Sequence, residues 1–311
     1  MAIGSANPPV ALIAGPTASG KSAVALALAE RRGGVIVNAD SAQLYRDLPI
    51  LSAAPSADER ARADHRLYQF QDGAEPCSAA DWAARARAEI DDIHRSGRLA
   101  ILAGGTGMYL RTLIDGIAPV PPIDPAVRSR VRETNVEANR AELERLDPAG
   151  AARLNPADAA RTARALEVVL STGRPLAEWQ SERTGGIGDR IDLRPLLLLP
   201  PRDWLYRRCD ERFRRMIDEG AIAEVEALLA RGLSPSLPVM RAIGVREIAA
   251  FLAGEISRDD AVTAGQQATR RYAKRQYTWF ARQPPPDWPR VFEPIESEQI
   301  GQALELIDGK D

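Results

Sequence analysis

The sequence feature that most constrains the fold of this chain is the octapeptide GPTASGKS at residues 15–22. It fits the phosphate-loop (P-loop) pattern GxxxxGK followed by Ser or Thr, in which glycines let the backbone curl until several N–H groups point at one anion. An apolar run precedes it at residues 10–14, and a segment with helical spacing follows at residues 22–32. The sequence therefore predicts a buried strand, a phosphate-binding loop and a helix in succession.

The polar residues of this loop have separate expected tasks. We expect Lys21 to reach a phosphate oxygen, and the Ser22 hydroxyl to be the metal ligand for Mg²⁺. The helix that follows adds the positive end of its dipole. We expect a diphosphate to be held by Gly15, Thr17, Ala18, Ser19, Gly20, Lys21 and Ser22.

Strand-like and helix-like segments alternate before residue 118, with strands at 35–37 and 99–102 and a helix at 80–95. This alternation predicts an α/β fold, a P-loop NTPase-like parallel sheet core with helices on both faces. After a proline-rich stretch at 118–125, APVPPIDP, only helical patterns follow until a strand resumes at 193–199. These helical patterns lie at 126–138, 139–146, 149–154, 159–171 and near Glu178.

The predicted domains are a core, residues 8–117 and 193–311, with C-terminal helices, and an inserted helical domain at 118–192. We expect the proline-rich stretch and the glycine-rich return at 184–189 to act as hinges. Three prolines at 284–286 predict a break, with a loosely defined tail after it.

Composition excludes several classes of protein. The 311 residues carry a net charge of −2, which excludes a broadly basic nucleic-acid coat but not a local basic groove. Two cysteines, Cys77 and Cys209, and two histidines argue against a disulfide framework and a zinc site. The first nine residues lack an apolar signal core, and no apolar run approaches the ~20 residues that span a bilayer. We expect a cytoplasmic monomer with no membrane partner.

A kinase with this loop should carry a second signature, an apolar strand that ends in an acid holding Mg²⁺. The segment 99–102 ends instead in Ala103, Gly104, Gly105 and Thr106. That corner offers backbone N–H groups and a hydroxyl in place of a carboxylate. The interpretation as a small-molecule kinase is weakened by this, but it stays open.

Asp40 directly follows the second predicted strand. Because the carboxyl ends of parallel strands meet at the ligand crevice, we expect Asp40 to face the P-loop. A carboxylate there can act as a general base or assist Mg²⁺. A helix N-cap is the alternative, and on the Asp-Ser dipeptide alone the cap is favoured.

Three motifs in succession resemble the bacterial tRNA dimethylallyltransferase (isopentenyltransferase) family: GPTASGKS, then DSAQLY at 40–45, then GGTGMYL at 104–110. The similarity continues at 64–67, 161–168 and 268–279, so that it covers residues 10–282. It implies transfer of a dimethylallyl group from dimethylallyl diphosphate to N6 of adenine 37 in the tRNA anticodon loop, with release of diphosphate. A prenyltransferase acting on free adenine nucleotide remains an alternative.

The resemblance also implies catalytic roles for three residues. Asp40 takes a proton from the amine, Thr106 holds that amine in line, and Arg212 neutralises the leaving diphosphate. The residues implied to contact tRNA are Asp40, Ser41, Ala42, Gln43, Thr106, Arg128, Ala160, Arg161, Thr162, Ala163, Arg164, Arg241, Ala242, Ile243, Gly244, Val245 and Arg246.

Two further basic segments bear on the interpretation. Residues 270–282 hold five basic residues and no acid, so we expect Arg271 and Lys274 to contact tRNA phosphates, a solvated face being the alternative. Residues 202–215 hold six arginines and three acids, and there we expect ordinary pairing at i,i+4 spacing.

The sequence departs from the family pattern at three positions. A GTAKP-like run reads LSAAP at 51–55, so that Ser52 keeps the hydroxyl and Ala54 loses the cation. An aromatic residue is replaced by Val245. His65 matches a family position, but a lone histidine is more often structural than catalytic, and we assign it no chemical role.

Overall fold

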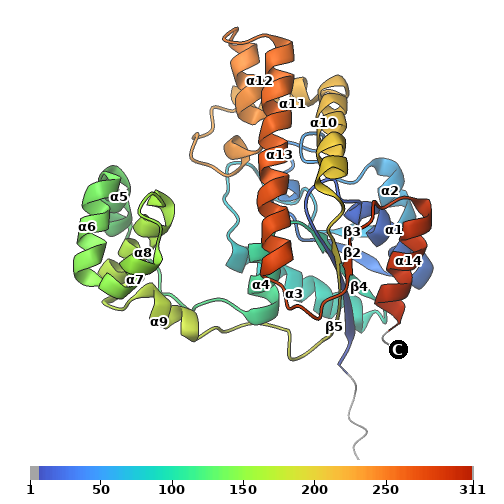
Figure 1. Cartoon of the computed structure of the whole chain (residues 1–311), viewed down its shortest axis with the longest axis horizontal. Helices are drawn as coiled ribbons and strands as arrows, with labels where there is room; N and C mark the ends of the chain where they lie inside the picture. The colour runs from blue at the N-terminus through green and yellow to red at the C-terminus, as the bar shows by residue number, and fades with distance from the viewer. Residues whose placement is uncertain (1–6, 310–311) are drawn as a thin grey trace, which may run out of the picture. The chain divides into compact units, whose positions relative to one another are not determined.

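A six-stranded parallel sheet forms the centre of the computed structural model, which describes residues 7–309 (Figure 1). The first six residues, part of the segment without a signal core, lie outside the described range. The strand order is β3-β2-β4-β1-β5-β6. The strands are β1 (Pro9–Ala14), β2 (Val35–Asn38), β3 (Asp64–Arg66), β4 (Ala100–Gly104), β5 (Asp192–Leu198) and β6 (Arg290–Val291). The parallel α/β core predicted from the alternating segments is confirmed, and β3 is an edge strand that the sequence pattern did not indicate.

The register of the sheet brings three loops to one edge. Ala14, the last residue of β1, pairs with Gly104 of β4, and Asn38 of β2 pairs with Ala103. The P-loop, Asp40 and the glycine-threonine corner each follow one of these strand ends. They meet because neighbouring parallel strands end at the same edge.

The P-loop leads into α1 (Lys21–Arg32). A Cβ at Gly15 would collide with the carbonyl oxygen of Leu198, so the close approach of β5 requires glycine there. Ala18 holds a left-handed conformation with φ 63°, which a residue with a side chain rarely adopts without outside support.

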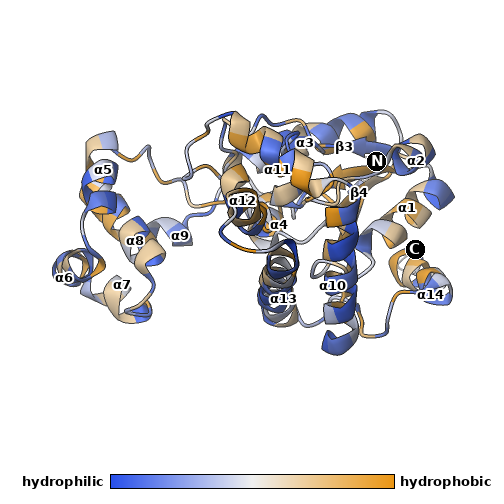
Figure 2. Ribbon diagram, turned by 90° about the horizontal axis from the view of Figure 1, so that it is seen from above, coloured by the Kyte–Doolittle hydropathy of each residue, from blue (hydrophilic) through white to orange (hydrophobic). Residues whose placement is uncertain are grey.

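Helices surround the sheet, and α10 (Arg202–Asp218) lies beside the long α13 (Arg258–Arg282) (Figure 1). A Cβ at Gly265 would collide with the Phe213 ring, so glycine permits this close packing. Much of α10 is hydrophilic (Figure 2). The part of the chain that contains the sheet has these further helices: α2 (Ala57–Arg62), α3 (Ala79–Arg95), α4 (Gly107–Asp115), α11 (Ala221–Ala230), α12 (Val245–Leu252), α14 (Ser297–Asp308) and the short η1 (Ser41–Leu44) and η2 (Val239–Arg241).

Residues 114–187 form a separate compact unit, whereas the sequence placed the insert at 118–192. Its helices are α5 (Pro125–Glu133), α6 (Val136–Leu146), α7 (Pro148–Arg153), α8 (Ala159–Thr172) and α9 (Leu176–Ser181). The predicted helix 126–138 is wrong, because the Asn135 side chain accepts from Ala138 N at 2.8 Å and begins a new helix. Val131, Leu143 and Leu166 lie in the buried core of the unit.

The two chain segments that join this unit to the rest of the protein run close together. Ile117 and Thr184 exchange backbone hydrogen bonds of 3.0 Å in both directions. A Cβ at Gly116 would meet the Thr184 carbonyl oxygen, and one at Gly186 the Ile114 carbonyl oxygen. The glycines therefore allow a tight pairing that brackets residues 118–183.

The prediction of a loosely defined tail after the prolines is wrong. β6 joins the sheet beside β5, and α14 packs against α1. Ile295, which is 6 % exposed, contacts Gly20 at the end of the P-loop. The apolar positions of the tail bury enough surface to order it. Across residues 7–309, no helix is both long enough and apolar enough to cross a membrane.

Candidate active site

Two adjoining cavities lie at the carboxyl edge of the sheet. The polar cavity, about 260 Å³, is lined by the P-loop together with Gln43, Glu59, Tyr68 and Arg208. The apolar cavity, about 310 Å³, includes Leu51, Tyr109, Phe213 and Met216 in its wall. Four residues line both cavities: Thr17, Asp40, Ser52 and Arg212. A molecule with its phosphate end in the polar cavity and its apolar end in the apolar cavity would therefore contact these four side chains.

The P-loop residues predicted to hold a diphosphate face the polar cavity, except Gly15, which lies behind them against β5. Lys21 Nζ donates to the Pro16 carbonyl oxygen at 2.7 Å. Burial lowers the pKa of Lys21 to about 8, with Asp40 opposing the shift and Arg212 adding to it. The buried Ser19 hydroxyl has no hydrogen-bond partner in the described chain, which leaves it available to a ligand.

Arg212 reaches the P-loop from α10 and donates to the Thr17 hydroxyl. Burial lowers the pKa of its guanidinium, and Asp40 opposes that change. Arg212 borders both cavities, so its charge lies where a phosphate and an apolar group would join.

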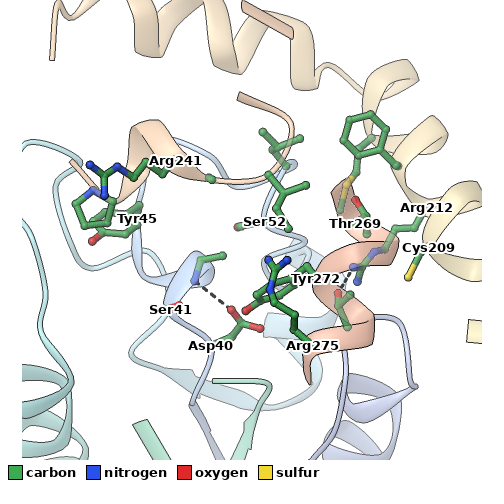
Figure 3. A pocket seen from close by; sticks show the side chains of 18 of the residues that line it. Asp40, Ser41, Tyr45, Ser52, Cys209, Arg212, Arg241, Thr269, Tyr272 and Arg275 are labelled. Carbon is green, nitrogen blue, oxygen red and sulfur yellow. Dashed lines mark hydrogen bonds between the residues drawn. The ribbon is translucent and has the colours of Figure 1, made fainter. Parts of the chain in front are cut away.

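Asp40 faces both cavities, as its place after β2 predicted, and it also caps η1. One carboxylate oxygen accepts from Ala42 N at 3.0 Å, so the N-cap alternative describes a real bond. The Asp40 backbone is held by the Asn38 side chain, which bonds its N–H at 2.8 Å and its carbonyl at 3.0 Å. Within residues 7–309 the second carboxylate oxygen accepts no hydrogen bond, and it faces Gly105. Figure 3 shows Asp40 grouped with Tyr272 and Arg275.

Thr106 lies behind Ser41 and lines neither cavity. Its hydroxyl accepts from Ser41 N at 2.9 Å and bonds the Ser41 hydroxyl at 3.2 Å. Ser41 and Ala42 line the apolar cavity. Thr106 is therefore joined through Ser41 to the wall of the apolar cavity.

Gln43 supports the LSAAP turn. Its side-chain amide donates to the carbonyl oxygens of Ser52 at 3.2 Å and Ala53 at 2.6 Å, and Ala53 has a positive φ of 55°. Ser52, the hydroxyl kept from the family pattern, borders both cavities. The turn that lacks the family cation is therefore still held against the site.

Helix α13 contributes residues that the sequence analysis missed. Buried Gln276 accepts from Thr17 N at 2.8 Å and donates to the Gly105 carbonyl oxygen at 2.9 Å, so it joins the P-loop to the glycine-threonine corner. Thr269, Tyr272 and Arg275 line the apolar cavity. Burial and the Asp40 charge raise the pKa of Tyr272. The helical spacing of buried positions 265, 269, 273, 276 and 280 was the signal that could have found this face.

Arg271 and Lys274 are exposed on α13 and line neither cavity. Although residues 270–282 contain no acid, Arg270 is paired, because it forms a salt bridge with Asp210 of α10. The expected i,i+4 pairing within residues 202–215 is wrong for Asp210, which pairs with Arg270 of α13.

The segment 241–246 borders two hollows. Arg241, Ala242 and Ile243 line the apolar cavity and also a second hollow, which exposed Arg246 lines too. Gly244 holds a φ of 97° at the start of α12. Val245 is 2 % exposed, so the departure from an aromatic residue lies inside the protein.

One basic candidate of the helical unit, Arg164, lies beside a buried carboxylate. Glu167, 2 % exposed, accepts from Arg132 Nε at 3.1 Å and lies 3.9 Å from Arg164 Nη1. Burial lowers the pKa of Arg164, and the nearby charges of Arg128 and Arg132 lower it further. The charge of Glu167 opposes this change. Arg161 pairs with Asp158, Ala160 is exposed, Ala163 is half-buried, and Thr162 is fully buried and cannot contact RNA directly.

Comparisons with known proteins agree with this arrangement. The model of the IPP transferase family matches residues 43–283. The tRNA dimethylallyltransferase of Erythrobacter litoralis (strain HTCC2594) is 64 % identical over 290 residues, 92 % of each chain. The full-length tRNA isopentenylpyrophosphate transferase of Bacillus halodurans superposes with a TM-score of 0.70 at 31 % identity, covering 97 % of this chain and 96 % of its own.

A eukaryotic dimethylallyltransferase acting on tRNA superposes with a TM-score of 0.77 at 29 % identity, covering 88 % of this chain and 69 % of its own. The match to the family model begins within the DSAQLY segment, at Gln43, and contains the glycine-threonine corner and all of α13. This chain belongs to the IPP transferase family.

Proposed function

We propose that this chain transfers a dimethylallyl group from dimethylallyl diphosphate to N6 of adenine 37 in a tRNA anticodon loop and releases diphosphate. One observation carries the proposal: a P-loop cavity and an apolar cavity share Asp40 and Arg212 in their walls. The donor has a diphosphate and an apolar tail, which match the two cavities. The relatives named tRNA dimethylallyltransferase support the same reaction.

In this reaction, N6 forms a bond to C1 of the dimethylallyl group while the bond from C1 to the diphosphate oxygen breaks. The electron pair of the broken bond leaves with the diphosphate, and Asp40 takes the proton from N6. Arg212 and Lys21 stabilise the negative charge that develops on the leaving group. The adenine amine is a poor nucleophile, and removal of its proton makes it a better one. The reaction therefore needs a base beside this amine.

A magnesium ion fits this site through the donor phosphates. The Ser22 hydroxyl and the Asp40 carboxylate line the same polar cavity and are oxygen ligands of the kind that Mg²⁺ prefers. Within residues 7–309, no group of three or more His, Cys, Asp or Glu side chains could hold a metal alone. The Ser22 hydroxyl would therefore be the protein ligand of an ion held mainly by phosphate and water oxygens, Asp40 would assist from the same cavity without binding the ion directly, and the ion would neutralise phosphate charge.

The acceptor must present an unstacked base, which the single-stranded anticodon loop allows at low cost. Arg241 and Arg275 line the apolar cavity and can bind phosphates next to that base. Through its bonds to Ser41, Thr106 would act on the amine indirectly. Arg128, Arg132 and Arg164 of the helical unit offer a second cationic surface, which a free nucleotide would not need.

Replacing residues 118–183 by a short linker should abolish tRNA modification and leave diphosphate binding intact. The cut preserves the paired Ile117 and Thr184, so the ends already lie side by side. The reason for the loss is that the anticodon stem needs phosphate contacts beyond the core. The measurements are transfer of labelled donor to tRNA and calorimetric binding of inorganic diphosphate.

A folded deletion variant that still modified tRNA would refute this use of the helical unit. One that prenylated AMP efficiently would instead favour the free-nucleotide alternative. Loss of both activities together with loss of the thermal unfolding transition would show that the unit only supports the fold.

Reversing the charges of Arg271 and Lys274 together to Glu should weaken tRNA binding and flatten its dependence on salt. Each phosphate contact that is lost removes about 0.7 to 0.9 from the slope of log K against log salt. The measurement is tRNA affinity at several salt concentrations.

The matched control reverses Arg31 and Arg95, which lie in the last turns of α1 and α3. It changes the net charge equally, at the edge of the sheet away from the P-loop. Equal slopes in the Arg271/Lys274 variant and this control would assign Arg271 and Lys274 to a solvated face.

The whole proposal is tested by incubating the protein with labelled dimethylallyl diphosphate and comparing unmodified tRNA, AMP and ATP as acceptors. We expect label on tRNA at adenine 37, with release of diphosphate. Label on AMP alone would favour a free-nucleotide prenyltransferase. Phosphoryl transfer from ATP, without use of the prenyl donor, would favour the kinase alternative.

A further inference from the structure

Arg208 lies on α10 one turn before Arg212, and both side chains line the polar cavity. Residues four apart on a helix share one face, so the two guanidinium groups approach the P-loop from the same side. The Arg208 charge also lowers the pKa of Arg212, a contribution smaller than that of burial. The two arginines differ in place, because Arg212 borders both cavities and Arg208 borders only the polar one.

The Arg208 side chain is held by two contacts that leave its outer nitrogens available. Nε donates to the Ala18 carbonyl oxygen at 3.2 Å, and the guanidinium lies 4.7 Å from the centre of the Trp204 ring. The structure gives Arg208 no acidic partner within residues 7–309. Both Nη nitrogens can therefore donate to a phosphate in the bidentate manner typical of arginine.

The supports of Arg208 are themselves fixed. Trp204 and Ala18 pack against the buried cluster of Leu205, Cys209 and Ala273. Ala18 holds its left-handed conformation at the turn of the P-loop, and the bond from Arg208 stabilises that backbone. A cation stacked on an indole and hydrogen-bonded to the loop itself is preorganised for a ligand in the loop.

We propose that Arg208, presented by Trp204, is a second diphosphate-binding arginine that contacts the outer phosphate of the donor. The assignment rests on the proposed function for the identity of the donor. Arg212, at the junction of the cavities, lies next to the phosphate that carries the breaking bond. Arg208, away from that junction, lies next to the terminal phosphate. It therefore contributes to the affinity for donor and released diphosphate more than to the rate of bond breaking.

The deciding variant is Arg208→Gln, which can still donate a hydrogen bond to Ala18 but carries no charge. We expect the Kd for inorganic diphosphate, measured by calorimetry without acceptor, to rise about tenfold, the effect of one charge-assisted contact. The KM for dimethylallyl diphosphate should rise similarly, while kcat at saturating donor should change by less than about threefold. The matched control is Arg207→Gln, since Arg207 is exposed on the same helix and lines no cavity described here.

Trp204 provides a second readout. Because its ring stacks on Arg208, we expect diphosphate to change the tryptophan emission of the wild type, and we expect Trp204→Phe to lose that change. The remaining four tryptophans stay in place in that variant. Arg208→Lys, which cannot make the Nε contact and stack together, should not restore wild-type affinity.

An Arg208→Gln variant that binds diphosphate as tightly as the wild type would overturn the proposal and leave Arg208 as a support for the Ala18 backbone. Equal weakening in Arg207→Gln would also overturn it, since the effect would then be one of net charge. The proposed function is judged separately, by whether the wild type labels tRNA. Failure there would leave the diphosphate result for Arg208 standing.

Discussion

Asp40→Asn should lower the turnover of tRNA modification by about 10²–10⁴-fold while tRNA binding persists. The amide keeps the shape of the side chain, and its oxygen can still accept from Ala42 N, so the cap of η1 survives. What is lost is the group that we propose as the acceptor of the proton from the adenine amine. Single-turnover rates at saturating donor and tRNA, with tRNA affinity measured separately, separate the two effects.

Asp124→Asn is the matched control for this change. Asp124 caps α5 through a bond to Ala126 N at 2.8 Å, with the same spacing of two residues as the bond from Asp40 to Ala42. We expect Asp124→Asn to change turnover little. If Asp40→Asn retained full turnover with an unchanged melting temperature, Asp40 would be a cap and nothing more.

Lys21→Ala should lower kcat/KM for dimethylallyl diphosphate by roughly 10²–10³-fold. Losses of this size are typical when an enzyme loses one preorganised hydrogen-bond donor that stabilises a charged transition state. Lys21 lies in the polar cavity, and burial there makes its charge strong towards a phosphate. Its pKa is lowered to about 8. Only the protonated form is a cation, so donor affinity of the free enzyme should fall as the pH rises through about 8.

The pH profile of diphosphate binding gives the check. The loss of affinity above about pH 8 should disappear in Lys21→Ala, because the titrating group is gone. Lys274→Ala, a change on the exposed face of α13, should keep the wild-type profile of diphosphate binding. An unchanged kcat/KM for the donor in Lys21→Ala would end the assignment of the P-loop to the diphosphate.

Local chemistry was enough to predict the edge of the sheet where the two cavities lie. The P-loop, the strand before it and the helix after it are encoded within residues 9–32, and Asp40 follows the end of β2. Parallel strands end at one edge, so the meeting of Asp40, Lys21 and the glycine-threonine corner followed from the order of elements.

Helix ends were less predictable where polar side chains decide them. The break between α5 and α6 depends on one cap bond, which the Asn135 side chain accepts, and the helix-like residues on both sides hide it. The ordered tail was missed for a different reason. Its apolar residues are few, and their burial depends on α1 and the P-loop, which lie more than 250 residues earlier in the chain.

The choice of helix face came from packing between distant segments. The sequence indicated C-terminal helices and two arginine-rich segments, 202–215 and 270–282, but neither property says which arginines point into a cavity. Arg208, Arg275 and Gln276 face the site because α10 and α13 pack together where Gly265 admits Phe213. A residue is buried only when another segment packs over it. The sequence of one helix can therefore show which of its faces is apolar, but not which segment packs on that face.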